Sequence, residues 1–74
     1  MKGKGKLKAD LGLRLQKLLL QKDLSIRGLA ARSGLEYSQL QKIVSGQVNI
    51  TLKTVEALAV GLNMSVAELF SEFK

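Results

Sequence analysis

Cysteine, histidine and proline are all absent from this chain of 74 residues. Without cysteine or histidine the chain can form no disulfide bond and none of the usual zinc sites, so its fold must be held together by apolar packing. The chain also has only six acidic residues and no glycine-rich phosphate loop, which leaves no set of side chains suited to catalysis. We therefore expect a protein that is not an enzyme and that needs no metal or cofactor.

Aromatic residues and long apolar runs are also scarce. The aromatics are Tyr37, Phe70 and Phe73 alone, whereas proteins that bind single-stranded nucleic acid need several rings on which bases stack. The longest run of leucines spans only residues 18–20, far short of a membrane span, and polar residues interrupt the N-terminal stretch where a signal peptide would be apolar. We expect a cytoplasmic protein.

The charges that are present are mostly positive. Twelve lysines and arginines accompany six acids, which gives a net charge of +6 and an isoelectric point near 10.0. This balance favours a polyanionic partner, which is DNA, RNA or an acidic membrane surface. The scarcity of aromatics favours duplex DNA among these three. With 46% hydrophobic residues, the chain has the composition of one small globular domain.

The chain divides into a short basic arm and a folded domain. Residues 1–8 alternate lysine with small or flexible residues, so we expect a flexible N-terminal arm that either contacts DNA or has no function. Residues 9–74 carry helical patterns and no candidate strand. The folded domain is therefore predicted to span residues 9–74.

A first helix is predicted from Asp10, as its N-cap, to Lys22. It has a single stripe of leucines that would face the core, namely Leu11, Leu15, Leu18 and Leu19. Leu13 and Leu20 lie off that stripe, and they either widen the buried face or form a contact patch.

Capping residues divide the remaining chain into four more helices. Ser25 caps a helix over residues 26–33, and Gly34 ends it because glycine takes the left-handed conformation at little cost. The next helix runs over residues 36–44 and ends at Ser45 and Gly46. The last two helices begin at Thr51 and at a capping box of Ser65 and Glu68, and their apolar residues are Leu52, Val55, Leu58, Ala59 and Leu62, then Val66, Leu69, Phe70 and Phe73. The predicted fold is an all-α, compact five-helix bundle.

The stretch 25–46 points to function. Its two helices, of about two turns each, are joined by Gly34 and Leu35, which is too short a link for an antiparallel hairpin, so they must cross steeply as in a helix-turn-helix. Over residues 11–70 the chain resembles the phage-repressor family, the Cro and lambda-repressor (XRE-type) helix-turn-helix domains. The matching positions, in order, are Ser25, Leu29, Ala30, Gly34, Leu40, Ile43, Ser45, Gly46, Thr51, Leu58, Ala59, Leu62, Ser65, Glu68 and Leu69.

The outward face of the third helix is the predicted DNA-reading surface. At about 100° per residue, Leu40, Ile43 and Val44 share one side with Glu36. The resemblance implies base-reading roles for residues on the other side and its flanks, namely Tyr37, Ser38, Gln39 and Lys42. Lysine would donate to guanine, Gln39 or Gln41 would pair with adenine, and the tyrosine ring would touch a thymine methyl group. The alternative is an ordinary solvated helix face.

Contacts to the DNA backbone are expected where helices begin, because unpaired N–H groups and the helix dipole attract phosphates there. The candidates are Ser25, Arg27, Thr51 and Lys53, together with Ser45 and Asn49 in the loop that members of the family use for the same purpose. For Ser25 and Thr51, simple helix capping is the other interpretation.

Two sites depart from the family pattern. Many members carry glutamine where this chain has Ile26, so Arg27 is expected to take over that backbone contact. Members also often have an arginine late in the first helix and a glutamate at the end of the third, which form a partly buried ion pair. The matching residues here are Leu19 and Val44. Because packed apolar residues often replace a buried ion pair without loss, we predict that Leu19 packs against Val44.

The resemblance implies a sequence-specific transcriptional regulator, of repressor type, that binds double-stranded DNA as a homodimer on a palindromic site. Self-association would use the bundle itself, with Phe70 and Phe73 as the first candidates for the contact and Leu13 and Leu20 as the second. The alternative is a protein-interaction module on the same fold, such as an antitoxin or a bridging factor, with a toxin or similar protein as partner.

Overall fold

Five α-helices make up the part of the chain that the computed structural model describes, which is residues 4–48 and 50–71, with side chains from residue 9 onward. They are α1 (Lys4–Gln21), α2 (Ile26–Ser33), α3 (Tyr37–Val44), α4 (Leu52–Gly61) and α5 (Val66–Leu69), and these residues include no strand. The predicted all-α, five-helix bundle is confirmed. Within the described ranges, no helix has the length and apolar character needed to cross a membrane.

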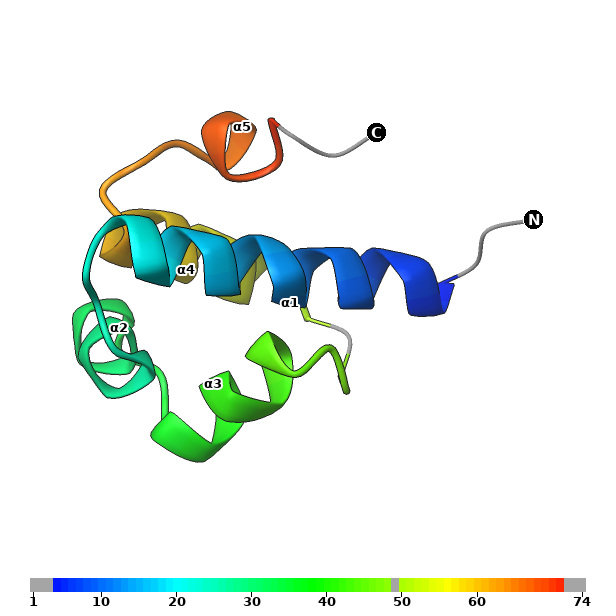
Figure 1. The fold of residues 1–74 in the computed structure, drawn as a ribbon, viewed down its shortest axis with the longest axis horizontal. Helices are drawn as coiled ribbons and strands as arrows, with labels where there is room; N and C mark the ends of the chain where they lie inside the picture. Colours follow the sequence, from blue (N-terminus) through cyan, green and yellow to red (C-terminus); the bar gives the residue numbers. More distant parts are fainter. Residues whose placement is uncertain (1–3, 49, 72–74) are drawn as a thin grey trace.

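The long helix α1 runs through the middle of the molecule (Figure 1). It packs against α3, while α2 packs against both α3 and α4, and α5 packs against α4. Figure 1 shows α3 and α5 on opposite sides of α1, and shows α2 nearly end-on where α3 is seen from the side. The steep crossing of α2 and α3 is the predicted helix-turn-helix arrangement.

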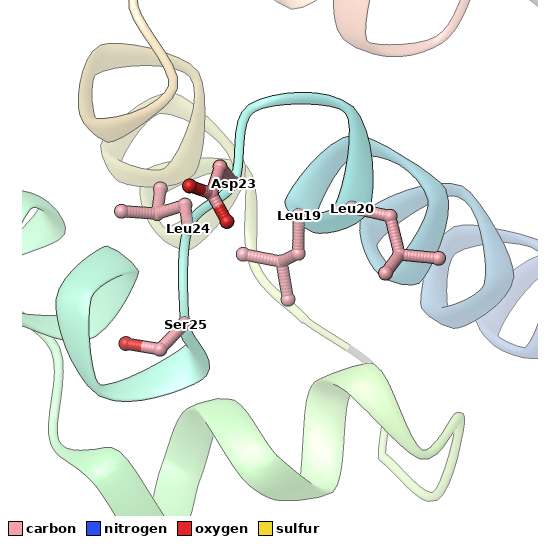
Figure 2. A pocket seen from close by; sticks show the side chains of 5 residues that line it. All are labelled: Leu19, Leu20, Asp23, Leu24 and Ser25. Carbon is pink, nitrogen blue, oxygen red and sulfur yellow. The ribbon is translucent and has the colours of Figure 1, made fainter.

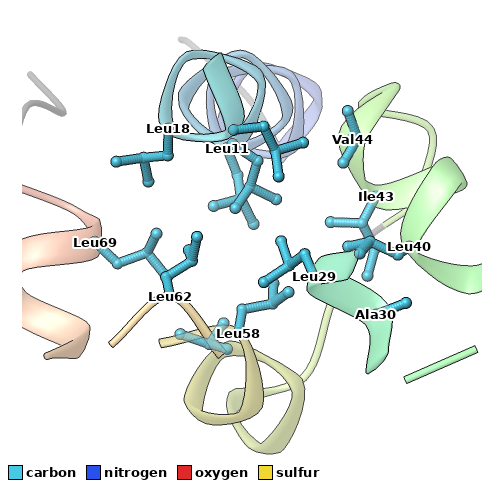
Figure 3. Packing of buried hydrophobic residues seen from close by; sticks show 13 residues of the cluster. Leu11, Leu18, Leu29, Ala30, Leu40, Ile43, Val44, Leu58, Leu62 and Leu69 are labelled. Carbon is cyan, nitrogen blue, oxygen red and sulfur yellow. The ribbon is translucent and has the colours of Figure 1, made fainter. Parts of the chain in front are cut away.

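The core is built almost entirely from aliphatic side chains of the first four helices and of Leu69 (Figure 3). The leucine stripe predicted for α1 is buried in full, and so are Leu40, Ile43 and Val44 of α3. The stripe predicted for α4 is correct except for Leu52, which is 69% exposed. Leu52 is the first residue of α4, and Ile50, in the loop just before it, packs against the core instead.

Three of the four predicted N-caps, Ser25, Thr51 and Ser65, are confirmed, and so is the C-cap Gly34; the fourth, Asp10, is not. The hydroxyl of Ser25 accepts a hydrogen bond from the backbone N–H of Gly28 at 2.9 Å, and that of Thr51 accepts from Thr54 at 3.2 Å. Ser65 and Glu68 form the reciprocal capping box, with distances of 3.0 and 2.8 Å. Gly34 ends α2 in the left-handed region, with φ of 72°.

Three predicted boundaries are wrong. Helix α1 begins at Lys4 and not at Asp10, so residues 4–8, which the sequence placed in the arm, are helical. Lysine, leucine and alanine are good helix formers and no proline stops the helix, so it extends past the polar residue chosen as its cap. Glu36 is the N-cap of α3 and not its first helical residue. Helix α5 ends at Leu69 with Phe70 as its C-cap, and Phe73 lies outside the described residues.

The predicted contact between Leu19 and Val44 is consistent with their burial, since both belong to the apolar core. The recorded neighbours of Val44 on α1 lie one to two turns earlier. The side-chain amide of Gln16 donates to the Val44 carbonyl oxygen at 2.9 Å, and a Cβ on Gly12 would lie 2.6 Å from the same oxygen. Direct packing of Leu19 on Val44 stays a prediction.

Candidate DNA interface

Helix α3 presents a continuous polar face to solvent. Its apolar residues anchor it against α1 and α2, and Leu40 and Ile43 are almost completely buried. The side chains of Ser38, Gln39, Gln41 and Lys42 are exposed, as the helical spacing predicted, and Tyr37 is half-buried. Hydroxyl, amide and ammonium groups therefore share an accessible helix face of the size that enters a major groove.

Tyr37 connects the start of α2 to this polar face. The guanidinium carbon of Arg27 lies 4.1 Å from the centre of the Tyr37 ring, within the range of a cation–π interaction. On the other side, the side-chain amide of Gln41 donates a hydrogen bond to the Tyr37 hydroxyl at 3.1 Å. The spacing of Tyr37 and Gln41, one helical turn apart, made the second contact available to sequence analysis. The contact between Arg27 and the Tyr37 ring depends on how α2 crosses α3, so no local sequence pattern predicts it.

The candidates for contact with the DNA backbone fall at helix ends. Ser25 and Arg27 lie at the start of α2, Thr51 and Lys53 at the start of α4, and Ser45 at the end of α3, and all five are exposed. The hydroxyls of Ser25 and Thr51 cap their helices, so the capping interpretation holds for both, and the Ser45 hydroxyl donates to the Gln41 carbonyl oxygen at 2.9 Å. Asn49 lies outside the described residues.

The two leucines that lie off the buried stripe of α1 are exposed, Leu13 by 62% and Leu20 by 84%. The wider buried face is thus excluded. Leu20 and Leu24 line an open pocket between α1 and α2 (Figure 2), in which the side chain of Leu19 points toward α3. Phe70, the first candidate for self-association, is half-buried and packs against the core.

Among the residues with described side chains, no group of three or more acids is placed to hold a metal ion.

The family model of the Cro/C1-type helix-turn-helix DNA-binding domain matches residues 14–72 of this chain. The chain therefore belongs to this family of DNA-binding domains, as the resemblance in its sequence indicated. The protein is therefore a regulator of the helix-turn-helix class.

Two proteins similar to this chain are named as controllers. One is called a control protein and the other a restriction–modification controller protein. The control protein C.MunI of a Mycoplasma species is 33% identical over 69 residues, which are 92% of this chain and 93% of that protein. The crystal structure of the restriction–modification controller protein C.AhdI from Aeromonas hydrophila superimposes with a TM-score of 0.81 at 36% identity, and the match covers 85% of this chain and 96% of the other.

Proposed function

We propose that the protein is a sequence-specific transcriptional regulator that binds a palindromic DNA site as a homodimer and controls the genes of a restriction–modification system. The observation that carries the proposal is its similarity to two control proteins along nearly their whole length, 93% and 96% of each chain. The regulator would act in the cytoplasm, where the DNA of a bacterium lies.

The exposed face of α3 supplies the base contacts in this proposal. Ser38 and Lys42 point directly away from the core, and Gln39 flanks them, so these three side chains enter the major groove first. Tyr37 borders the same groove. The phosphates flanking the site would be bound at the starts of α2 and α4 and at the end of α3, through Ser25, Arg27, Thr51, Lys53 and Ser45.

The small size of the reading surface supports a dimer. One α3 of eight residues reaches only a few base pairs, and a second copy one helical turn away, roughly 34 Å along the DNA, doubles the sequence that is read. No specific observation favours the alternative of a protein-interaction module, since both similar proteins are named as controllers.

Selection from random duplex DNA tests the proposal. The expected result is an enriched inverted repeat whose half-sites are about 34 Å apart, matched by a sequence upstream of restriction–modification genes. Enrichment of one unrepeated half-site would overturn the dimer, and no enrichment at all would overturn sequence-specific binding. A variant with Lys42→Ala should lose the preference at one position of each half-site and keep its fold.

A further inference from the structure

We infer that Tyr37 is a positioning residue, which holds the guanidinium of Arg27 ready for a DNA phosphate. This rests on the proposed function and changes the role predicted for Tyr37, which was direct contact with a base. The pair joins the two elements of the helix-turn-helix, because Arg27 lies in the first turn of α2 and Tyr37 opens α3.

The chemistry of the stack leaves Arg27 free to bind an anion. The guanidinium carbon of Arg27 lies over the ring, 4.1 Å from the ring centre. A guanidinium stacked in this way keeps its N–H donors at its edge, in the fork geometry that matches a phosphate. The arginine is exposed, so these donors are accessible to a phosphate from solvent.

Gln41 fixes the ring that carries the arginine. Its amide donates to the Tyr37 hydroxyl at 3.1 Å, so the ring is held by this hydrogen bond at one end and by the backbone of α3 at the other. A long, exposed arginine otherwise loses much rotamer freedom on binding DNA, and an arginine already ordered by stacking loses less. The consequence is tighter binding to any duplex, with no preference for a base, because phosphates carry no sequence information.

The experiment measures DNA affinity against salt concentration for the wild-type chain and four variants: Tyr37→Leu, Tyr37→Phe, Arg27→Gln and the double variant Y37L/R27Q. Losing the arginine should reduce the slope of log K against log salt by about one. Y37L should weaken binding about two- to fivefold, the range expected for an exposed cation–π contact. Y37F, which keeps the ring and loses only the hydroxyl, should bind more tightly than Y37L.

The double variant decides the inference. If Tyr37 acts through Arg27, then Y37L in the R27Q background has almost no further effect on affinity. If the two losses multiply instead, then Tyr37 contacts DNA by itself and the inference is overturned. A Y37F variant as weak as Y37L would also overturn the stacking role, because Y37F retains the ring face.

A second readout needs no DNA, so it separates this inference from the proposed function. Tyr37 is the only tyrosine and the chain has no tryptophan, so near-ultraviolet circular dichroism in the tyrosine band reports on this ring alone. R27Q should reduce that signal, and the matched variant Arg32→Gln, which removes an exposed arginine at the other end of α2, should leave it unchanged. A signal that responds to neither variant would overturn the stack even if the protein binds DNA as proposed. If R27Q lowers the tyrosine signal as expected but the wild-type protein binds no DNA, then the proposed function alone is overturned.

Discussion

At the scale of single residues, the packing of α2 against α4 involves a polar atom for which the described residues supply no partner. The hydroxyl of Ser33 is buried, and the described residues provide no hydrogen-bond partner for it. It sits against Gly61, where an added Cβ would collide with the hydroxyl and lie 3.1 Å from Leu29. The glycine therefore allows α2 and α4 to approach, and the hydroxyl contributes no interaction to that approach.

Replacing Ser33 with alanine is expected to raise the free energy of unfolding by about 1 kcal/mol, because a buried, unpaired hydroxyl costs about that much and alanine also forms helix better. Urea denaturation monitored by far-ultraviolet circular dichroism measures the change. The exposed Ser38→Ala on α3 serves as the control and should change stability by less than about 0.5 kcal/mol. A Ser33→Ala variant that is less stable than the wild type would show that the hydroxyl has a partner.

Caps and buried stripes were predictable at this scale because their signals are local. Ser25, Gly34 and the box of Ser65 with Glu68 act within one helical turn of their own backbone, so residue type and spacing sufficed. The stacking of Arg27 on Tyr37 was not predictable. It depends on the crossing of two helices and on two side-chain rotamers, neither of which leaves a pattern in the chain.

At the scale of helices, the contact between α1 and α3 depends on a missing side chain. A Cβ on Gly12 would lie 2.6 Å from the carbonyl oxygen of Val44 and 3.0 Å from the backbone nitrogen of Gly46. Both neighbours are backbone atoms, which cannot rotate away, so the two helices would have to separate.

The variant Gly12→Ala is expected to lower the free energy of unfolding by about 2 kcal/mol, since overpacking costs more than the helix propensity gained by alanine. Gly34→Ala provides the comparison. Its positive φ makes alanine strained there, and nothing lies within 4 Å of the added Cβ, so it should cost only about 1 kcal/mol. Denaturation curves that rank the two variants in the opposite order would contradict the close approach of α1 to α3.

Helix α5 has only four residues, too few to be stable alone. The buried side chain of Arg14 on α1 holds its C-terminal end by donating to the carbonyl oxygens of Leu69 and Glu68, each at 3.0 Å. Carbonyl oxygens in the last turn of a helix have no i+4 donor within it, and that of Glu68 also accepts from the backbone N–H of Ser71 at 3.2 Å. The position of α5 therefore depends on α1 as well as on α4.

An Arg14→Met variant is expected to lose about 2 kcal/mol of stability, the contribution of charge-assisted hydrogen bonds. Hydrogen exchange should show faster exchange at the amides of Leu69 and Phe70, which bond to Ser65 and Val66 in the wild type. Arg32→Met, at an exposed position on α2, should leave those amides unchanged. Unchanged protection in the Arg14 variant would mean that the core contacts of Leu69 hold α5 without the arginine.

The starts and ends of elements were the least predictable part of the fold. The sequence placed the first helix boundary at Asp10, since aspartate is a frequent N-cap, yet α1 continues back to Lys4 although Gly5 and the lysines of its first turn disfavour a helix there. Leu52 lies on the apolar side of α4, as the helical period predicted, but its predicted burial is wrong. Burial also requires a neighbouring element at that point along α4. Periodicity predicts which side of a helix is apolar, and the tertiary arrangement decides how far along the helix that side is covered.

At the scale of the whole molecule, the proposed dimer needs a surface that joins two copies. Phe70 packs against the core, whereas Leu13 and Leu20 are exposed and lie two turns apart on the same side of α1. Two exposed leucines on one helix face are costly in a monomer and useful in an interface. Of the two surfaces that the sequence suggested, the α1 surface is therefore the better candidate, with Leu24 at its edge.

The double variant Leu13→Ser with Leu20→Ser is expected to weaken dimerisation at least about ten-thousandfold, since the two copies together would bury four leucines and each contributes at least about 1.5 kcal/mol. Sedimentation equilibrium measures the dissociation constant. Leu52→Ser with Val60→Ser is the matched control, because these residues on α4 are similarly exposed, by 69% and 75%, and this variant should remain as dimeric as the wild type. If the α4 variant dissociates and the α1 variant does not, then the interface lies on α4. Because a dimer on a palindrome binds DNA with both copies at once, the variant that dissociates should also lose affinity for the full site and keep its affinity for an isolated half-site.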